Sequence, residues 1–178
     1  MSARLEPPRL VLLDRDGTLN RKPDEGDYIT TVDQLELLPA AADAVRRLND
    51  AGVPVAVVTN QRGVALGRLT RTQLGHVHAG LRACLDARGA QIDRIYYCPH
   101  DRGACRCRKP EPGLLERAGR DFGVPMAQAA MVGDADSDVE AGRRAGALTV
   151  QLVDDGTRSA ADLTVPDLAA AVDLLLAR

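Results

Sequence analysis

The sequence predicts an α/β fold in which a doubly wound, Rossmann-like parallel sheet carries helices on both faces. Five short apolar runs alternate with stretches of helical periodicity, which is typical of repeated strand–helix–strand units. Glycines follow the helical stretches and stand close to the next apolar run, as glycines at helix ends do. Ligands of such sheets bind beyond the carboxyl ends of the strands. Polar residues at those ends are therefore the candidates for a functional site.

The expected strands are the apolar runs. Residues 10–13 read Leu-Val-Leu-Leu, and a run without polar residues is typical of a strand buried on both faces. The later runs share this character, and they lie at 53–58, 92–97, 129–132 and 148–153.

The expected helices have apolar residues three and four positions apart. The first covers 41–51 and the second 74–85, where Thr70 and Gln73 fit a capping box at the start. Three further helices are expected to begin near Leu114, to include 141–145 and to cover 168–175. The glycines expected at helix ends are Gly52, Gly89, Gly123 and Gly146.

Length and composition favour one globular domain across residues 1–178, because 45% of the residues are hydrophobic and 27% are charged. A net charge of −2 and only four aromatic residues argue against nucleic-acid binding. No window of 18 residues is apolar throughout, and residues 1–8 lack the apolar core of a signal peptide. We therefore expect a cytoplasmic protein, a monomer, with neither a membrane nor a nucleic-acid partner.

The strongest chemical signal is Asp14-Arg15-Asp16-Gly17, directly after the first expected strand. One carboxylate can attack while the other carries protons, and two negative charges this close favour a divalent cation. Taken alone, the pattern is also compatible with a turn or a fragment of a calcium site. The EF-hand pattern is incomplete, because neither its third oxygen-bearing residue nor its later glutamate is present.

Polar residues also stand at three later junctions between the expected strands and helices. Thr59 and Asn60 follow the second strand, and their hydroxyl and amide groups can bind an anion. Arg108 and Lys109 precede the third helix, where they could neutralise phosphate, although a solvated basic pair is the simpler reading of that motif alone.

Asp134 follows the fourth strand and Asp138 comes four residues later. Asp134 alone could be a helix N-cap, but it could also join Asp14 around Mg²⁺, a cation that takes oxygen ligands. No purely structural explanation accounts for these polar residues at four successive strand ends.

This order of motifs resembles the haloacid dehalogenase superfamily of phosphohydrolases over roughly residues 9–153. The segments 14–20, 58–61 and 107–110 are similar to the branch that contains heptose bisphosphate and histidinol-phosphate phosphatases. The resemblance implies that Asp14 is the nucleophile and Asp16 the general acid and base. It also implies that Thr59 and Lys109 hold the phosphoryl group.

The same resemblance implies the metal ligands. Mg²⁺ would bind Asp14, the backbone carbonyl of Asp16, and Asp134. Asp138 would not bind the ion itself but would lie next to these ligands.

A second metal site is expected in the loop at 98–107, which contains Cys98, His100, Cys105 and Cys107. Three thiolates and an imidazole suit tetrahedral Zn²⁺ in a closed structural site. The spacing differs from the usual zinc-finger pattern, so a disulfide and chance clustering are the alternatives, but a cytosolic chain disfavours the disulfide. The related branch carries a zinc loop at this position, which favours structural zinc that shapes the pocket.

The short spacing between motifs leaves no room for a cap domain, so we expect an open site screened by the irregular stretch 20–38, here called the flap, and by the zinc loop. The resemblance points to the 7-phosphate of D-glycero-D-manno-heptose 1,7-bisphosphate, a small phosphorylated sugar. Arg108 would bind the second phosphate, with Asn60 and Arg62 as further contacts.

The chain departs from the usual pattern of that branch at three positions, which are Arg62, Leu66 and Ala135. Histidinol phosphate is the alternative substrate. A phospho-acceptor signalling module and a phosphate-binding protein without turnover are the non-enzyme alternatives, against which the Asp16 acid/base and the zinc loop argue.

Overall fold

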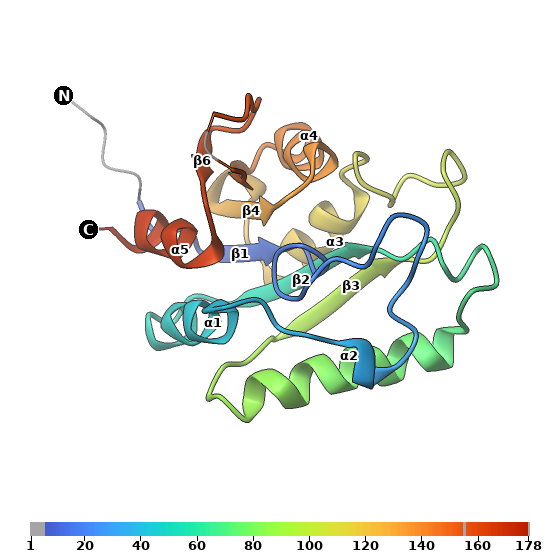
Figure 1. Cartoon of the computed structure of the whole chain (residues 1–178). Coiled ribbons are helices and arrows are strands. Elements are labelled where there is room, and N and C mark those ends of the chain that lie inside the picture. The colour runs from blue at the N-terminus through green and yellow to red at the C-terminus, as the bar shows by residue number, and fades with distance from the viewer. Residues whose placement is uncertain (1–5, 155, 178) are drawn as a thin grey trace.

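The computed structural model describes residues 6–154 and 156–177 and confirms the doubly wound α/β fold (Figure 1). All strand pairs are parallel, and the sheet has the order β3-β2-β1-β4-β5-β6. The strands are β1 (Leu10–Leu13), β2 (Val55–Asn60), β3 (Arg94–Cys98), β4 (Ala129–Gly133), β5 (Leu148–Leu152) and β6 (Leu163–Val165). Residues 1–5, part of the segment that lacks a signal-peptide core, lie outside the described residues.

The expected helices are present as α1 (Ala41–Asp50), α2 (Arg71–Asp86), α3 (Gly113–Phe122), α4 (Asp136–Ala145) and α5 (Leu168–Leu176), with short 3-10 turns η1 (Val32–Gln34) and η2 (Met126–Gln128). The capping box of α2 forms as expected, since the N–H of Gln73 donates to the Thr70 hydroxyl at 3.1 Å and Gln73 Oε1 accepts from the Thr70 N–H at 2.8 Å. Among the described helices, none combines the length and apolarity that a membrane crossing requires.

The alternation of side chains along the strands gives the sheet two apolar faces. In β1, Val11 and Leu13 join the core under α1, α2 and α5, whereas Leu10 and Leu12 join the core under α3 and α4. Figure 1 shows these helices on opposite sides of the sheet. All four β1 side chains are fully buried, which explains why their sequence contains no polar residue.

The sheet differs from the expectation in β6 and in the bounds of some strands, such as β3, which begins at Arg94 instead of Ile92. β6 was not expected, because a three-residue edge strand with one polar member is too short to show a period. β2 begins at Val55 instead of Val53, because Pro54 has no N–H to donate to a neighbouring strand. At its other end β2 extends through Thr59 and Asn60, so these polar residues belong to the strand itself.

The strand order places a topological switch point at the carboxyl ends of β1 and β4. The chain moves outward from β1 through β2 to β3, then returns to β4 on the other side of β1. The crevice at such a point is the usual ligand site of an open α/β sheet. Asp14 and Asp134 follow directly after these two strands.

Candidate active site

The predicted catalytic residues line one pocket of about 260 Å³ at the carboxyl edge of the sheet. Its walls combine strand ends, the segment before α3, the start of α4 and the flap. The lining residues that the sequence singled out are Asp14, Asp16, Thr59, Asn60, Lys109 and Asp138. The flap contributes residues 22–29, so it screens the pocket as expected.

Lys109 is the central cation of this pocket and is only 3% exposed. Its Nζ lies 2.9 Å from Asp14 Oδ1 and 2.6 Å from Asp138 Oδ1, and it donates to the Val58 carbonyl at 2.7 Å. Burial alone would lower the pKa of Lys109, but the carboxylates of Asp138 and Asp14 outweigh it and hold the pKa above its usual value. The ammonium group therefore stays charged beside Asp14.

Asp14 is also buried, and burial raises its pKa to about 6 although Lys109 acts in the opposite direction. The nearby carboxylates of Asp138 and Asp16 add to the rise. A cation bound at this carboxylate would lower the pKa again and keep Asp14 ionised, as a nucleophile must be.

Asp14, Asp134 and Asp138 form an oxygen-rich cluster whose carboxylate atoms lie within 4.8 Å of one another. One oxygen of Asp134 accepts from Lys22 Nζ at 2.7 Å, and its other oxygen is buried without a hydrogen-bond partner. This unpartnered oxygen, together with the hard donor set, fits a divalent cation such as Mg²⁺. Asp138, expected only as a supporting residue, contacts Lys109 directly.

Gly17 allows the close approach of β1 and β4 at this point. Its φ is +90°, and a Cβ atom there would lie 2.5 Å from the Asp134 carboxylate. Any larger residue would therefore displace a predicted metal ligand as well as strain the backbone.

The Asp16 carboxylate is held by three side chains, of which the sequence predicted none. Arg15 donates to both oxygens at 3.0 and 2.9 Å, Asn20 donates to Oδ1 at 2.9 Å, and Gln61 donates to Oδ2 at 3.1 Å. Gln61 also donates to the Thr59 hydroxyl at 2.9 Å. These partners outweigh the effect of burial and hold the pKa of Asp16 below its usual value.

Asn60 was expected to contact the substrate, and in the structure its side chain binds the backbone of Lys109. Its Nδ2 donates to the Lys109 carbonyl at 2.9 Å, and its Oδ1 accepts from the Lys109 N–H at 3.0 Å. Both polar ends of the amide therefore hold the backbone of Lys109, which ties the end of β2 to the segment before α3.

A second pocket of about 720 Å³ adjoins the first, and both are lined by Asn60, Lys109 and Ser137. Arg102, Arg106 and Arg108 also line this second pocket, which we call the arginine pocket. Nη1 of Arg108 is buried and has no hydrogen-bond partner within the described residues. Arg62 lines neither pocket, because its guanidinium pairs with Asp101 at 2.5 Å.

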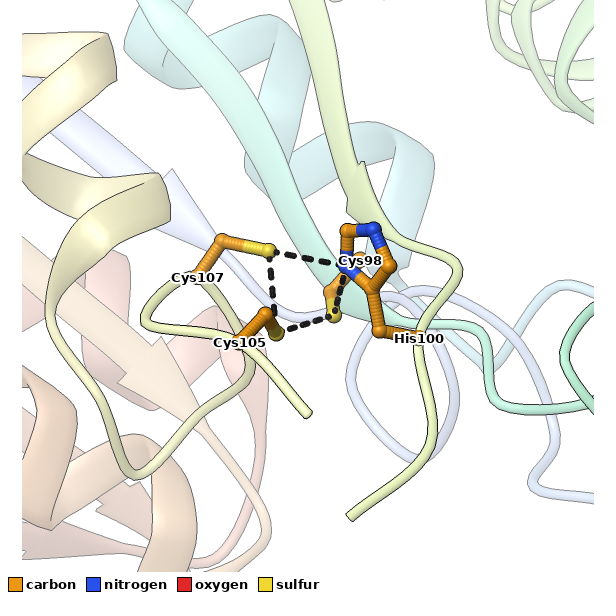
Figure 2. Close-up of side chains that lie close together, drawn as sticks. All are labelled: Cys98, His100, Cys105 and Cys107. Atoms are coloured by element: carbon orange, nitrogen blue, oxygen red, sulfur yellow. Dashed lines mark hydrogen bonds between the residues drawn. The ribbon is translucent and has the colours of Figure 1, made fainter. Parts of the chain in front are cut away.

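The loop that leads to Arg108 gathers a separate cluster of metal-binding side chains, as Figure 2 shows for Cys98, His100, Cys105 and Cys107. The sulfurs of adjacent cysteines lie 3.3 and 3.5 Å apart, and His100 Nδ1 lies 3.3 and 3.5 Å from two of them. These spacings are close to the edges of a tetrahedron around Zn²⁺, which are about 3.5–3.8 Å. The cluster can therefore hold a metal ion.

Sequence reasoning missed four residues of the site, which are Arg15, Asn20, Gln61 and Lys22. Arg15, Asn20 and Gln61 lie within the motifs 14–20 and 58–61, so their place in the chain pointed to the site. Their residue types did not indicate that they would bind Asp16. Lys22 belongs to the irregular flap, and only the fold brings it to Asp134.

Comparison with known proteins agrees with this geometry. The haloacid dehalogenase-like hydrolase family matches residues 20–146. The D-glycero-beta-D-manno-heptose-1,7-bisphosphate 7-phosphatase of Pseudomonas aeruginosa is 43% identical over 136 residues, which cover 75% of each chain. The enzyme of the same name from Escherichia coli K12 is 38% identical over 154 residues, covering 82% of this chain and 79% of that one.

The fold also matches solved structures. A D,D-heptose 1,7-bisphosphate phosphatase from B. bronchiseptica, crystallised with magnesium and phosphate, superposes with a TM-score of 0.84. The two are 31% identical, and the match covers 94% of this chain and 98% of that chain. The fold, the carboxylate pocket and these relatives agree: the chain belongs to the haloacid dehalogenase-like hydrolases and is a phosphatase.

Proposed function

We propose that this phosphatase removes the 7-phosphate of D-glycero-D-manno-heptose 1,7-bisphosphate and leaves the 1-phosphate in place. The observation that carries the proposal is the pair of adjoining pockets. One holds the carboxylates and Lys109, and the other presents three arginines. A sugar with two phosphates has an anionic group for each pocket. The names of the relatives from P. aeruginosa and E. coli support the same substrate.

In the proposed reaction Asp14 attacks phosphorus, and the bond from phosphorus to the sugar oxygen breaks. In its protonated form Asp16 gives that oxygen a proton and becomes the carboxylate, which is the form that Arg15, Asn20 and Gln61 hold in the structure. The carboxylate later takes a proton from the water that hydrolyses the aspartyl phosphate, which restores the acid. Lys109 and Thr59 bind the phosphoryl oxygens and offset their charge.

The proposed ligands of Mg²⁺ are Asp14, Asp134 and the backbone carbonyl of Asp16. Bound there, the ion supplies positive charge to the phosphoryl group. Asp138 holds Lys109 in place from the other side.

The arginine pocket would provide binding energy remote from the bond that breaks, and such energy positions the reacting group. We expect Arg108→Ala to lower kcat/KM for the bisphosphate by about 10²-fold, because its guanidinium makes a charge-assisted contact with the second phosphate. The same change should alter kcat/KM for heptose 7-phosphate, which lacks that phosphate, by about threefold at most. Phosphate release from each substrate measures the difference.

Arg120→Ala is the matched control, since Arg120 is exposed on α3 outside both pockets. It should leave both rates unchanged. Equal losses on the two substrates in Arg108→Ala would contradict the bisphosphate proposal. A kcat/KM for histidinol phosphate above that for the bisphosphate would contradict it as well, because the three arginines do not attract the cationic amine of that substrate.

We further propose that the cluster of Cys98, His100, Cys105 and Cys107 holds one structural Zn²⁺. Its ligands suit zinc, and the loop packs directly on the start of α3. Gly113 donates its N–H to the Arg106 carbonyl at 3.2 Å, and a Cβ at Gly113 would lie 2.4 Å from that oxygen. Zinc would then fix the loop that carries Arg108 and Lys109.

Removal of one zinc ligand should therefore reduce stability and activity together. We expect Cys105→Ser to lose the metal and to lower the melting temperature, whereas Cys84→Ser, on α2 outside the cluster, should do neither. Elemental analysis of protein purified under reducing conditions measures the bound zinc. Wild-type protein without zinc, or Cys105→Ser with a full complement, would rule out this site.

We also propose that the chain forms one domain over residues 1–178 and acts as a cytoplasmic monomer without a nucleic-acid or membrane partner. The net charge of −2 supports the absence of a nucleic-acid partner. Three thiols gathered as free cysteines suit a reducing compartment.

A further inference from the structure

We propose that Arg62 is a positioning residue, which holds one turn of the loop at 98–107 so that Arg102 is in place for the second phosphate. This turn, here called the outer turn, is residues 101–104 and lies between His100 and Cys105 of the metal-binding cluster. The inference rests on the proposed bisphosphate substrate. It assigns a role to a residue that lines neither of the two adjoining pockets.

The outer turn is open to solvent. Arg102, Gly103 and Ala104 are exposed, and Asp101 is half-buried. Within the turn, the Ala104 N–H donates to the Asp101 carbonyl at 3.3 Å, and the Arg102 N–H donates to Asp101 Oδ1 at 2.6 Å. These bonds stabilise the shape of the turn, but they do not fix its place against the rest of the protein.

Arg62 supplies a contact from outside the loop. Its Nε donates to Asp101 Oδ1 at 2.5 Å. Among the described residues, Arg62 is the one side chain outside 98–107 that forms a hydrogen bond or an ion pair with the outer turn. The carboxylate oxygen that it binds also accepts the N–H of Arg102, which lines the arginine pocket. The position of Arg102 therefore depends on Arg62 through Asp101.

Arg62 is itself attached to a fixed part of the molecule. On one side of it, Gln61 is buried and donates its N–H to the Cys98 carbonyl at 2.8 Å. On the other side, Gly63 packs closely on the flap, where a Cβ atom would lie 2.8 Å from Tyr28 Cδ1. The backbone is held before and after Arg62, so its side chain can pass this fixed position on to the outer turn.

The ion pair itself contributes little to stability. The side chains of Arg62 and Asp101 are 31% and 47% exposed, and such pairs are screened by solvent. Its contribution lies in preorganisation instead. An arginine on an untethered turn loses more conformational freedom when it binds a phosphate, and that loss weakens binding. Breaking the pair should therefore leave the fold intact and weaken the contact between Arg102 and the second phosphate.

The test compares the bisphosphate with heptose 7-phosphate, which has no phosphate for Arg102. We expect Arg62→Met to lower kcat/KM for the bisphosphate by about 10-fold, mainly through a higher KM. The same variant should change kcat/KM for heptose 7-phosphate by about twofold at most, with the melting temperature unchanged. Arg62→Lys keeps a cation beside Asp101 and should stay within about threefold of wild type on both substrates. A loss in Arg62→Lys as large as that in Arg62→Met would contradict the inference.

Asp101→Ala separates positioning from direct contact. Removal of a carboxylate near three arginines should by charge alone favour an anionic substrate. We nevertheless expect a loss of about fivefold on the bisphosphate, because the outer turn is released. The double variant Arg62→Met/Asp101→Ala should lose no more than Arg62→Met, since both changes break the same contact. If Asp101→Ala matches or exceeds wild type while Arg62→Met loses activity, Arg62 binds the phosphate itself and the positioning role is wrong.

Arg68→Met is the matched control, since Arg68 is exposed in the same loop after β2 and lines neither pocket. It should leave both rates unchanged. Arg108→Ala tells failure of this inference from failure of the proposed function. A selective loss on the bisphosphate in Arg108→Ala, with none in Arg62→Met, would overturn the positioning role alone. Equal losses on both substrates in Arg108→Ala would overturn the bisphosphate proposal and this inference with it.

Discussion

Asp14→Asn should abolish phosphate release, with a loss of roughly 10⁴-fold or more, because an amide cannot replace the attacking carboxylate. The protein should remain folded. Asparagine has nearly the same shape, and Lys109 keeps its contact with Asp138 at 2.6 Å after the change. Phosphate release measures the first expectation, and thermal unfolding followed by circular dichroism measures the second.

Asp33→Asn is the matched control for this change, since Asp33 is an exposed carboxylate of η1 and lies outside the catalytic pocket. It should turn over substrate at the wild-type rate. Substantial turnover by Asp14→Asn, in protein free of wild-type contamination, would eliminate an aspartyl-phosphate mechanism for this enzyme.

Lys109→Met should produce the largest combined loss of activity and stability. The substitution leaves the buried carboxylates of Asp14 and Asp138 facing each other without a cation. Removing one partner of a buried charge network destabilises by about 3–5 kcal/mol, so the metal-free variant should lose that much in free energy of unfolding. Turnover should become undetectable, because the phosphoryl group loses its buried positive charge.

Urea denaturation in EDTA and then in Mg²⁺ measures this loss. Mg²⁺ should recover part of it, since a divalent cation can replace the missing charge near Asp14. Lys22→Met is the control for stability, because the Lys22 side chain is 58% exposed and its pairing with Asp134 is screened by solvent. A metal-free Lys109→Met protein as stable as wild type would show that the buried carboxylates do not depend on this lysine.

The sequence was sufficient for the central fold and for much of the catalytic pocket. The apolar run of β1 and the helical spacing of α1 and α2 are local patterns, so they could be read without tertiary information. The rule that ligands bind at the carboxyl ends of parallel strands drew attention to Asp14, Thr59 and Lys109, and the resemblance to the hydrolase family supplied their expected roles. The structure confirms that these side chains line one pocket.

The remaining features depend on contacts between distant segments. β6 is defined by its pairing with β5, and three residues carry too little pattern to reveal it. Arg62 was expected to contact the second phosphate, whereas in the structure its guanidinium pairs with Asp101. Asp101 belongs to the loop at 98–107, which the fold brings close to Arg62. No pattern in the order of residues indicates which of many arginines will meet which acid.

The central position of β1 in the sheet determines how far the protein must open before Asp14 moves. β1 lies between β2 and β4, and its side chains are completely buried, whereas β3 and β6 are the two edges. Local opening of a protein starts where few contacts hold the chain, and the most protected amides exchange with solvent only when the whole molecule unfolds. Fraying of the short edge strand β6 would therefore disturb α5 long before it moved Asp14. Asp14 directly follows β1, so we expect it to keep its place until the whole molecule unfolds.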